Sequence, residues 1–510
     1  MLPKEFKDRM RLILGDGAER LFDELESTDA VKSFRLNGIK CRAEQFEKNG
    51  AVIDRDESLW IENAYYTKEK FPGSLPEHHA GAIYMQDPSA MATIKALENI
   101  EGLTVLDSCA APGGKTGQLA AAVGECGVVF ANEYEAQRAK ILQSNVERMG
   151  CSNIVITNVD TSTYRDDYEE YFDIVVCDAP CSGEGMFRKN ERAIEEWSLD
   201  NVLMCAERQR EILANVIPCI KQGGVLLYST CTFSLEENEM NVAWVLDNYP
   251  ELELVDVPCD LKNATSDGFC YEGCLYDMKK TRRCYPHITK GEGQYIALFR
   301  KHRDIRDADC VAEDCSAVND EKRSGKREKP SKNGKNNNGK FENKQNVELI
   351  ELGKSFLAEN LVRIPEGEYI VKGDKLWLAP RVKLPEYGVV AAGVCLGECQ
   401  KGRFVPHHQL FSAFGSMFLR KLRFSFNSAM SYAYLFGEEL DIGELKRVSD
   451  AENCNDLNEC GDCDAYFAPS NSQNGWAAVL LGGCAVGGVK ISGNAAKNHY
   501  PKGLRNKRIG

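Results

Sequence analysis

The feature that most constrains the fold is an alternation of continuous apolar runs with helical segments between residues 96 and 300. The runs FDIVVC at 172–177 and GGVLLYS at 223–229 are typical of parallel strands buried on both faces. The same pattern predicts strands at 104–109, 127–133, 154–159, 172–178 and 224–230, and helices at 116–123, 135–149 and 199–217. We therefore expect a doubly wound α/β domain.

The rest of the 510-residue chain predicts further units around this domain, because the length suits about three domains. A first unit at 1–95 opens with a helix whose Phe6, Met10, Ile13 and Leu14 share a face. The α/β domain is expected at 96–301, a disordered linker poor in large apolar side chains at 302–347, and short strands separated by Gly and Pro at 348–510.

Charge and hydropathy narrow the function classes. The net charge of −14 argues against a uniformly basic nucleic-acid coat, although nine Lys or Arg against three Glu at 321–344 and the basic end KNHYPKGLRNKR leave local RNA contacts open. No run approaches the ~20 apolar residues of a membrane span, and the amino terminus lacks a signal-peptide pattern. We expect a cytoplasmic protein whose 21 cysteines stay reduced.

The loop after the first predicted strand, Cys109 to Lys115, indicates a nucleotide-type cofactor. Its small residues allow close backbone approach, and the following helix offers free N–H groups. The Walker P-loop and GxGxxG patterns are both absent, so ATP hydrolysis and NAD chemistry lose support. Glu133, Asp160 and Asp178 end the later strands, and carboxylates there suit the adenosine and the cationic sulfonium of S-adenosylmethionine.

Cys181 and Cys231 are the candidate nucleophiles. Each follows an apolar strand, where open α/β sheets place their ligands, in the segments DAPCSGEG and YSTCT. A cysteine at such a position is more often a small buried hydrophobic residue. The shared context beside one cofactor loop favours a reactive pair of thiols.

These segments resemble the RNA (cytosine-5) methyltransferases of the Nol/Nop/Sun type, and among them the bacterial RsmF-like ribosomal RNA enzymes. The resemblance rests on PKEFKDRMRLILG, FRLNGIK, QDPSAM, CAAPGGKT, DAPCSGEG, YSTCT, GEGQYIALFR and AKNHYPKGLR, and so spans nearly the whole chain. It implies a Rossmann-like S-adenosylmethionine-dependent methyltransferase domain between an N-terminal RNA-binding domain and a C-terminal PUA-like RNA-binding domain.

The resemblance also implies roles for individual residues. Cys231 would add to carbon-6 of a cytosine so that carbon-5 takes the methyl group, and Cys181 would assist release of the product. Asp178 would lie near the cofactor or hydrogen-bond the cytosine edge. The residues implied to hold S-adenosylmethionine are Cys109, Ala110, Ala111, Pro112, Gly113, Gly114, Lys115, Glu133, Asp160 and Asp178. The expected substrate is 16S ribosomal RNA, bound by a monomer.

Several alternatives remain open at this point. The RNA could be a tRNA, or the protein could be a non-catalytic ribosome-assembly factor, although the retained cysteine pair argues against the latter. Cys454, Cys460 and Cys463 include a single CxxC, whereas zinc sites usually pair two such units. His407 and His408 are more readily structural or RNA-facing than metal ligands. DAPC departs from the motif of amino-directed DNA methyltransferases.

Overall fold

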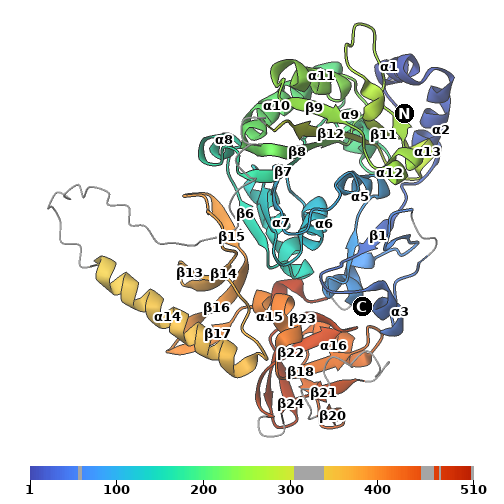
Figure 1. Ribbon diagram of the computed structural model, residues 1–510. Coiled ribbons are helices and arrows are strands. Elements are labelled where there is room, and N and C mark those ends of the chain that lie inside the picture. The colour runs from blue at the N-terminus through green and yellow to red at the C-terminus, as the bar shows by residue number, and fades with distance from the viewer. Residues whose placement is uncertain (56–59, 304–337, 449–463, 470–472, 507–510) are drawn as a thin grey trace, which may run out of the picture.

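The computed structural model describes residues 1–55, 60–303, 338–448, 464–469 and 473–506 (Figure 1). Its largest element is a ten-stranded sheet whose central strands are parallel. In sheet order the strands are β10 (Ser266–Asp267), β11 (Arg282–Cys284), β12 (Gln294–Lys301), β8 (Ile220–Thr230), β7 (Phe172–Asp178), β4 (Thr104–Asp107), β5 (Val128–Asn132), β6 (Ile154–Thr157) and β15 (Val389–Ala392), with β9 (Leu252–Val255) paired to β12.

Helices cover both faces of this sheet, so the doubly wound α/β prediction is confirmed. Alternate strand residues belong to opposite layers: Val105 shares a core cluster with residues of α6 and α7, whereas Leu106 shares one with residues of α8, α10 and α11. The helices of this domain are α5 (Pro88–Ile94), α6 (Gly114–Val123), α7 (Ala136–Met149), α8 (Ser162–Asp167), α9 (Glu191–Glu195), α10 (Leu199–Val216), α11 (Glu239–Asn248), α12 (Cys259–Ala264) and α13 (Pro286–Thr289).

The amino-terminal unit combines a small antiparallel sheet with amphipathic helices. The predicted first helix is α1, and its Phe6 and Met10 are fully buried while Ile13 and Leu14 pack at the edge of the same cluster. Its elements are α1 (Lys4–Leu14), α2 (Ala18–Ser27), β1 (Ser33–Leu36), α3 (Ala43–Lys48), β2 (Ala64–Tyr66), α4 (Pro76–His79) and β3 (Ile83–Met85), in the sheet order β2-β1-β3.

The carboxyl-terminal region contains two further sheets. The first has the order β13 (Glu368–Lys372), β14 (Lys375–Ala379), β16 (Val394–Gln400) and β17 (Arg403–Pro406), and is followed by α15 (His408–Phe414). The second has the order β19 (Leu440–Asp441), β24 (Ala495–Asn498), β23 (Cys484–Ser492), β22 (Gly475–Leu481), β18 (Lys421–Phe424), β21 (Ala465–Phe467) and β20 (Lys446–Val448), with α16 (Ala429–Phe436) against it.

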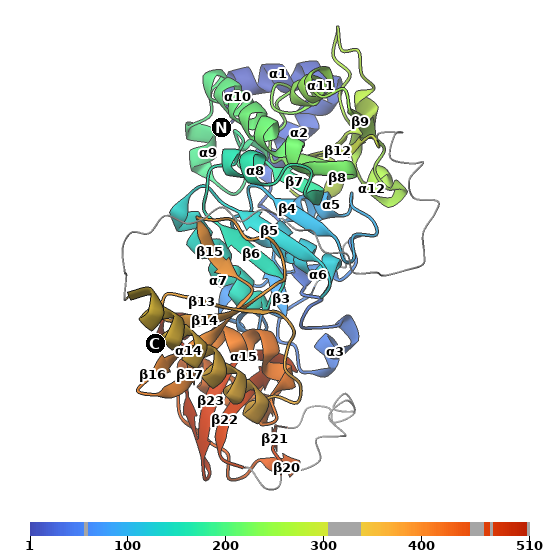
Figure 2. The same ribbon diagram turned by 60° about the vertical axis from the view of Figure 1, so that its left-hand side comes forward.

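The prediction of disorder is wrong for the last part of the linker. The helix α14 (Asn338–Asn360) begins inside the segment 302–347 that composition predicts to be disordered (Figure 2). Leu349, Phe356 and Leu357 anchor this helix against the β13-β14-β16-β17 sheet. Because adding a residue to an existing helix costs far less than starting one, the anchored turns carry the helix back into the polar segment. Residues 304–337 lie outside the described residues.

The four parts of the chain meet at the side chain of Lys40. Its Nζ donates to Ala80 O at 3.0 Å in the amino-terminal unit and to Arg148 O at 2.8 Å on α7. It also donates to Ser412 Oγ at 3.0 Å on α15 and to Ala485 O at 2.8 Å on β23. Four acceptors thus surround one lysine amino group, which ties the flanking units to the central domain, and burial lowers its pKa to about 7.

Among the residues that the structure describes, no helix is long and apolar enough to cross a membrane.

Candidate active site

The two candidate cysteines lie together at the carboxyl ends of neighbouring strands. Cys181 follows β7 and Cys231 follows β8, and these strands are parallel partners in the sheet. Their Sγ atoms are 3.1 Å apart, and the Cys231 N–H donates to Cys181 Sγ at 3.3 Å. Both side chains are half-buried, so each sulfur remains within reach of a ligand at the sheet edge.

The surroundings of the Cys181 thiol favour its protonated form. The hydrogen bond with Cys231, followed by burial, raises the pKa of the Cys181 thiol well above its ordinary value. Cys181 therefore keeps its proton at neutral pH and can donate it toward the Cys231 sulfur. A thiol donor at this distance stabilises negative charge on Cys231, which is the form of cysteine that acts as a nucleophile.

The backbone between the two cysteine loops is tightly packed. Gly185 N donates to Cys231 O at 2.9 Å. A Cβ on Gly185 would lie 2.7 Å from Cys231 O and 2.6 Å from the Cα of Gly293, so only glycine fits between these chains. The loops therefore hold the cysteine pair through main-chain contacts as well as through side chains.

The predicted cofactor loop runs from Cys109 to Lys115, between β4 and α6. Gly113 has a φ of 106°, in the left-handed region, and a Cβ there would lie 3.0 Å from Leu142 Cδ1. The helix α6 starts at Gly114 without a side-chain cap, so its first N–H groups point toward the sheet edge. The hydrogen bond with Cys177, followed by burial, raises the pKa of Cys109, which stays a thiol.

A buried carboxylate beside this loop was missed by the sequence reasoning. Asp107, the last residue of β4, is 1% exposed. Its Oδ2 accepts from Thr116 Oγ1 at 2.7 Å, whereas its Oδ1 has no hydrogen-bond partner among the described residues. Burial first, and then the charges of Asp178 and Glu133, raise its pKa to about 7. Asp107, Asp178 and Glu133 thus place three acids together, and one buried oxygen of Asp107 is left to accept from a ligand. This arrangement fits a cationic cofactor such as S-adenosylmethionine. Its position at a strand end was the available signal.

The other predicted cofactor acids have different surroundings. Glu133 follows β5, is 4% exposed, and accepts from Glu135 N at 3.0 Å. Asp160 is exposed beyond β6 and accepts from Ser162 N at 2.9 Å and Ser162 Oγ at 2.6 Å, bonds that lower its pKa. Glu133 thus lies in a ligand-like position, whereas Asp160 also stabilises the start of α8.

Asp178 connects the cofactor loop to the cysteine loops. Its Oδ2 forms an ion pair with Lys115 Nζ at 2.7 Å, and its Oδ1 accepts from Ser229 Oγ at 2.6 Å and from Gln294 Nε2 at 3.3 Å. The residue ends β7, three positions before Cys181. The structure therefore brings the cofactor loop, Asp178 and both cysteines to one edge of the sheet.

The remaining sequence candidates do not form a metal site among the described residues. His407 caps α15 by accepting from Gln409 N at 3.3 Å, and the His408 ring packs against Tyr500 with centroids 5.4 Å apart. Burial lowers the pKa of His407 to about 4 and that of His408 to about 3, so both are neutral structural side chains. Cys454, Cys460 and Cys463 lie outside the described residues.

Fold and site together define a class, the S-adenosylmethionine-dependent methyltransferases with a Rossmann-like sheet. Residues 94–300 match the family described as 16S rRNA methyltransferase RsmB/F, and 2–88 match the N-terminal domain of 16S rRNA methyltransferase RsmF. Residues 355–414 match the first C-terminal domain of RsmF, and 465–506 match its PUA domain, which confirms the expected PUA-like unit. The chain belongs to the RsmF family of 16S rRNA methyltransferases.

Individual relatives agree with this assignment. A protein from Vibrio parahaemolyticus named ribosomal RNA small subunit methyltransferase F is 31% identical over 75% of this chain and 76% of its own length. A protein of the same name from Klebsiella pneumoniae is 38% identical, but the alignment spans 48% of this chain and only 50% of that relative. A solved methyltransferase homologue from Pyrococcus horikoshii is 29% identical with a TM-score of 0.51, covering 59% of this chain and 95% of its own.

Proposed function

We propose that this protein methylates carbon-5 of cytosine in RNA through a covalent cysteine–cytosine intermediate, with 16S ribosomal RNA as its substrate. The observation that carries the proposal is the pair of sulfur atoms 3.1 Å apart at the sheet edge that also holds the cofactor loop. S-adenosylmethionine supplies the methyl group. The small-residue loop, Asp107 and Glu133 would hold it.

The proposed sequence of steps assigns one task to each cysteine. The Cys231 sulfur forms a bond to carbon-6 of cytosine, which makes carbon-5 electron-rich enough to take the methyl group. A base then removes the carbon-5 proton, and the bond between sulfur and carbon-6 breaks to restore the ring. Cys181, protonated beside the departing sulfur, assists this release by donating a hydrogen bond to the developing thiolate.

Asp178 would contact the cofactor, the target base or both. Its ion pair with Lys115 and its bond from Ser229 fix the carboxylate at the end of β7, between the cofactor loop and the cysteines. From that position it can accept a hydrogen bond from the amino group of a cytosine. Such an enzyme must act on single-stranded RNA or turn the base out of its stack.

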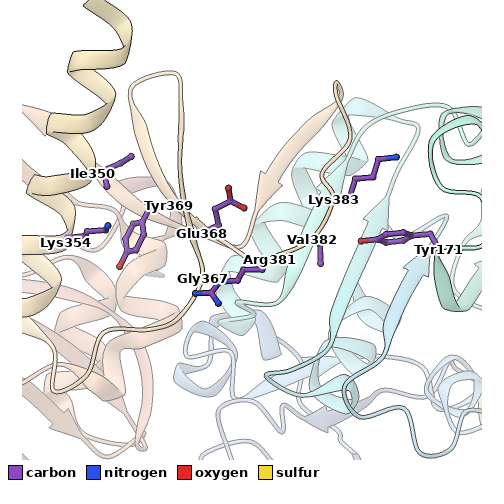
Figure 3. A pocket seen from close by; sticks show the side chains of 9 residues that line it. All are labelled: Tyr171, Ile350, Lys354, Gly367, Glu368, Tyr369, Arg381, Val382 and Lys383. Atoms are coloured by element: carbon purple, nitrogen blue, oxygen red, sulfur yellow. The ribbon is translucent and has the colours of Figure 1, made fainter. Parts of the chain in front are cut away.

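A groove away from the cysteines supports the RNA part of the proposal (Figure 3). It encloses about 840 Å³ between α14, β13 and the segment after β14, and it faces Tyr171 just before the start of β7, at the opposite end of that strand from Asp178. Figure 3 shows aromatic and basic side chains on both walls. The groove is lined by Tyr171, Ile350, Lys354, Gly367, Glu368, Tyr369, Arg381, Val382 and Lys383.

The chemistry of this groove suits an RNA backbone. Lys354 and Arg381 are exposed cations, and Glu368 is the single acid among the lining residues. The Lys354 ammonium lies 4.8 Å from the centroid of Tyr369, whose buried hydroxyl has no hydrogen-bond partner in the part of the chain that the structure describes. In proteins that bind single-stranded RNA, cationic side chains bind the phosphates and aromatic rings stack on the bases. We propose that RNA flanking the target cytosine lies here.

The test is an in vitro methylation of purified 16S ribosomal RNA and tRNA with S-adenosylmethionine, followed by bisulfite mapping of 5-methylcytosine. The proposal predicts a bisulfite-resistant cytosine in 16S ribosomal RNA with the natural protein and none with Cys231→Ala. Methylation of tRNA alone would contradict the substrate. Binding of RNA without any methylation by the natural protein would indicate an assembly factor instead.

A further inference from the structure

Two buried glutamates connect the cysteine loops reciprocally. Glu184 follows Cys181 in the chain, is fully buried, and is bound by donors from the other loop. It accepts from Thr232 Oγ1 at 2.9 Å, Phe233 N at 2.9 Å and Ser234 Oγ at 2.7 Å. A fourth bond comes from Trp197 Nε1 at 2.8 Å. Four donors saturate the two oxygens of an ionised carboxylate.

Glu237, which follows Cys231, is bound by donors from the Cys181 loop. Its Oε2 accepts from Ser182 N at 3.0 Å and from Gln209 Nε2 at 2.8 Å. Its Oε1 lies 2.5 Å from Ser182 Oγ. The two oxygens therefore differ: one receives two N–H bonds, as a carbonyl oxygen does, and the other meets only a hydroxyl.

Four oxygens form a continuous chain between the two glutamates. Glu237 Oε1 lies 2.5 Å from Ser182 Oγ, which lies 2.8 Å from Thr232 Oγ1, which lies 2.9 Å from Glu184 Oε2. Each of these three contacts needs one proton to be a hydrogen bond. The two hydroxyls supply two protons. With Thr232 donating to Glu184, as the other three donors around Glu184 favour, Ser182 donates to Thr232. The third contact is then complete only if the Glu237 carboxyl carries a proton and donates it to Ser182.

The surroundings of Glu237 favour the protonated form. Burial, and next the charge of Glu184, raise the pKa of Glu237 to about 7 against the hydrogen bonds from Ser182, which lower it. Among the described residues, titratable groups that interact with Glu237 from neighbouring elements include Cys181, Glu184, Cys205 on α10 and Tyr228 on β8. None of these four groups is a cation, so none favours an ionised Glu237.

We propose that Glu237 is a positioning residue that holds a proton at neutral pH and thereby completes the hydrogen-bonded bridge that sets the Cys181–Cys231 pair. The bridge runs through Ser182 and Thr232, the residues that directly follow the two cysteines. The consequence for catalysis rests on the proposed function, whereas the bound proton does not.

The direct test is infrared spectroscopy of the full chain, comparing the natural protein with Glu237→Gln without RNA. Below pH 7, the difference spectrum should show loss of the C=O stretch of a protonated carboxylic acid, and that band should fade as the pH rises past 7. Glu184→Gln is the matched control and should remove carboxylate bands only. Loss of a carboxylate band in Glu237→Gln at pH 6 would overturn the proposal. If that variant does not fold, Ser182→Ala should shift the carboxylic acid band without removing it, and an unchanged band would refute the bridge.

Methyl transfer distinguishes positioning from a merely structural role. A glutamine at 237 can donate its N–H to Ser182 Oγ and accept from Ser182 N and Gln209, as the protonated acid does. Methyl transfer by the natural protein should decline above pH 7, where Glu237 loses its proton. Glu237→Ala should lose methyl transfer, whereas Glu237→Gln should retain it without this decline. A decline retained in Glu237→Gln would contradict the proposal. Absence of methylation in every protein, with the carboxylic acid band present, would refute the proposed function alone.

Discussion

Replacing Arg283 on β11 by methionine should destabilise the packing of α11 against the loop that carries Cys231. The Arg283 guanidinium donates through Nε to Glu239 Oε1 at 2.7 Å, through Nη2 to Glu239 Oε2, and through Nη1 to Phe233 O at 2.8 Å. The two charged side chains are 2% and 0% exposed, so water cannot replace the lost donors. Breaking such a buried pair by removing one partner costs about 3–5 kcal/mol.

A local measurement suits this prediction, because a chain with several domains does not unfold in one two-state step. Hydrogen exchange of the amides in α11, which begins at Glu239, should speed up by about two to four powers of ten, since 1.4 kcal/mol corresponds to a factor of ten. The control is Arg300→Met on the neighbouring strand β12, where the side chain is exposed. Arg283→Met together with Glu239→Met should recover most of the protection. Exchange in Arg283→Met no faster than in Arg300→Met would refute the reasoning.

Two further predictions concern the ligands. Glu133→Ala should weaken S-adenosylmethionine binding in calorimetry, because a buried strand-end carboxylate is lost, whereas Glu135→Ala at the exposed neighbouring position should not; equal affinities would remove Glu133 from the site. Lys354→Glu and Arg381→Glu should each weaken RNA binding and lower the salt dependence of log K by about 1, with Lys4→Glu on α1 as the control for net charge. Salt dependence unchanged relative to Lys4→Glu would contradict an RNA-binding groove.

The central sheet was predictable because its strands are continuous apolar runs. The predicted strands at 172–178 and 224–230 correspond to Phe172–Asp178 and Ile220–Thr230. Because parallel strands end at one edge of a sheet, the same pattern predicted that the cofactor loop, Asp178 and both cysteines would meet. The 3.1 Å contact between the sulfurs follows from the pairing of β7 with β8.

Features that depend on long-range packing were not predictable. The strand β15 pairs with β6, and Figures 1 and 2 both show it at the edge of the central sheet, although its short sequence carries no signal for that partner. The amino-terminal Phe34 shares one core with Phe424 and Val479 of the seven-stranded sheet. Deleting 348–510 would therefore expose the edge of β6 and part of this core, so single charge reversals test RNA binding more cleanly.

The polar network around the cysteines also escaped the sequence reasoning. Glu237 stands in the acidic run LEENE, which looks like exposed surface, and Glu184 stands between two glycines in a short loop, yet both are fully buried. A pattern of residue types shows neither which donors converge on a carboxylate nor that Asp107 Oδ1 lacks one. Such details come from contacts between loops that are about 50 residues apart in the chain.

The assignment of the two cysteines is tested most directly by trapping the protein on its RNA. Cys181→Ala incubated with 16S ribosomal RNA and S-adenosylmethionine should accumulate a protein–RNA adduct that survives denaturing electrophoresis, because addition proceeds and release is slowed. Cys231→Ala should form no adduct and transfer no methyl group while still binding RNA reversibly. Normal turnover by Cys181→Ala with no trapped adduct, or an adduct formed by Cys231→Ala, would contradict the assigned roles.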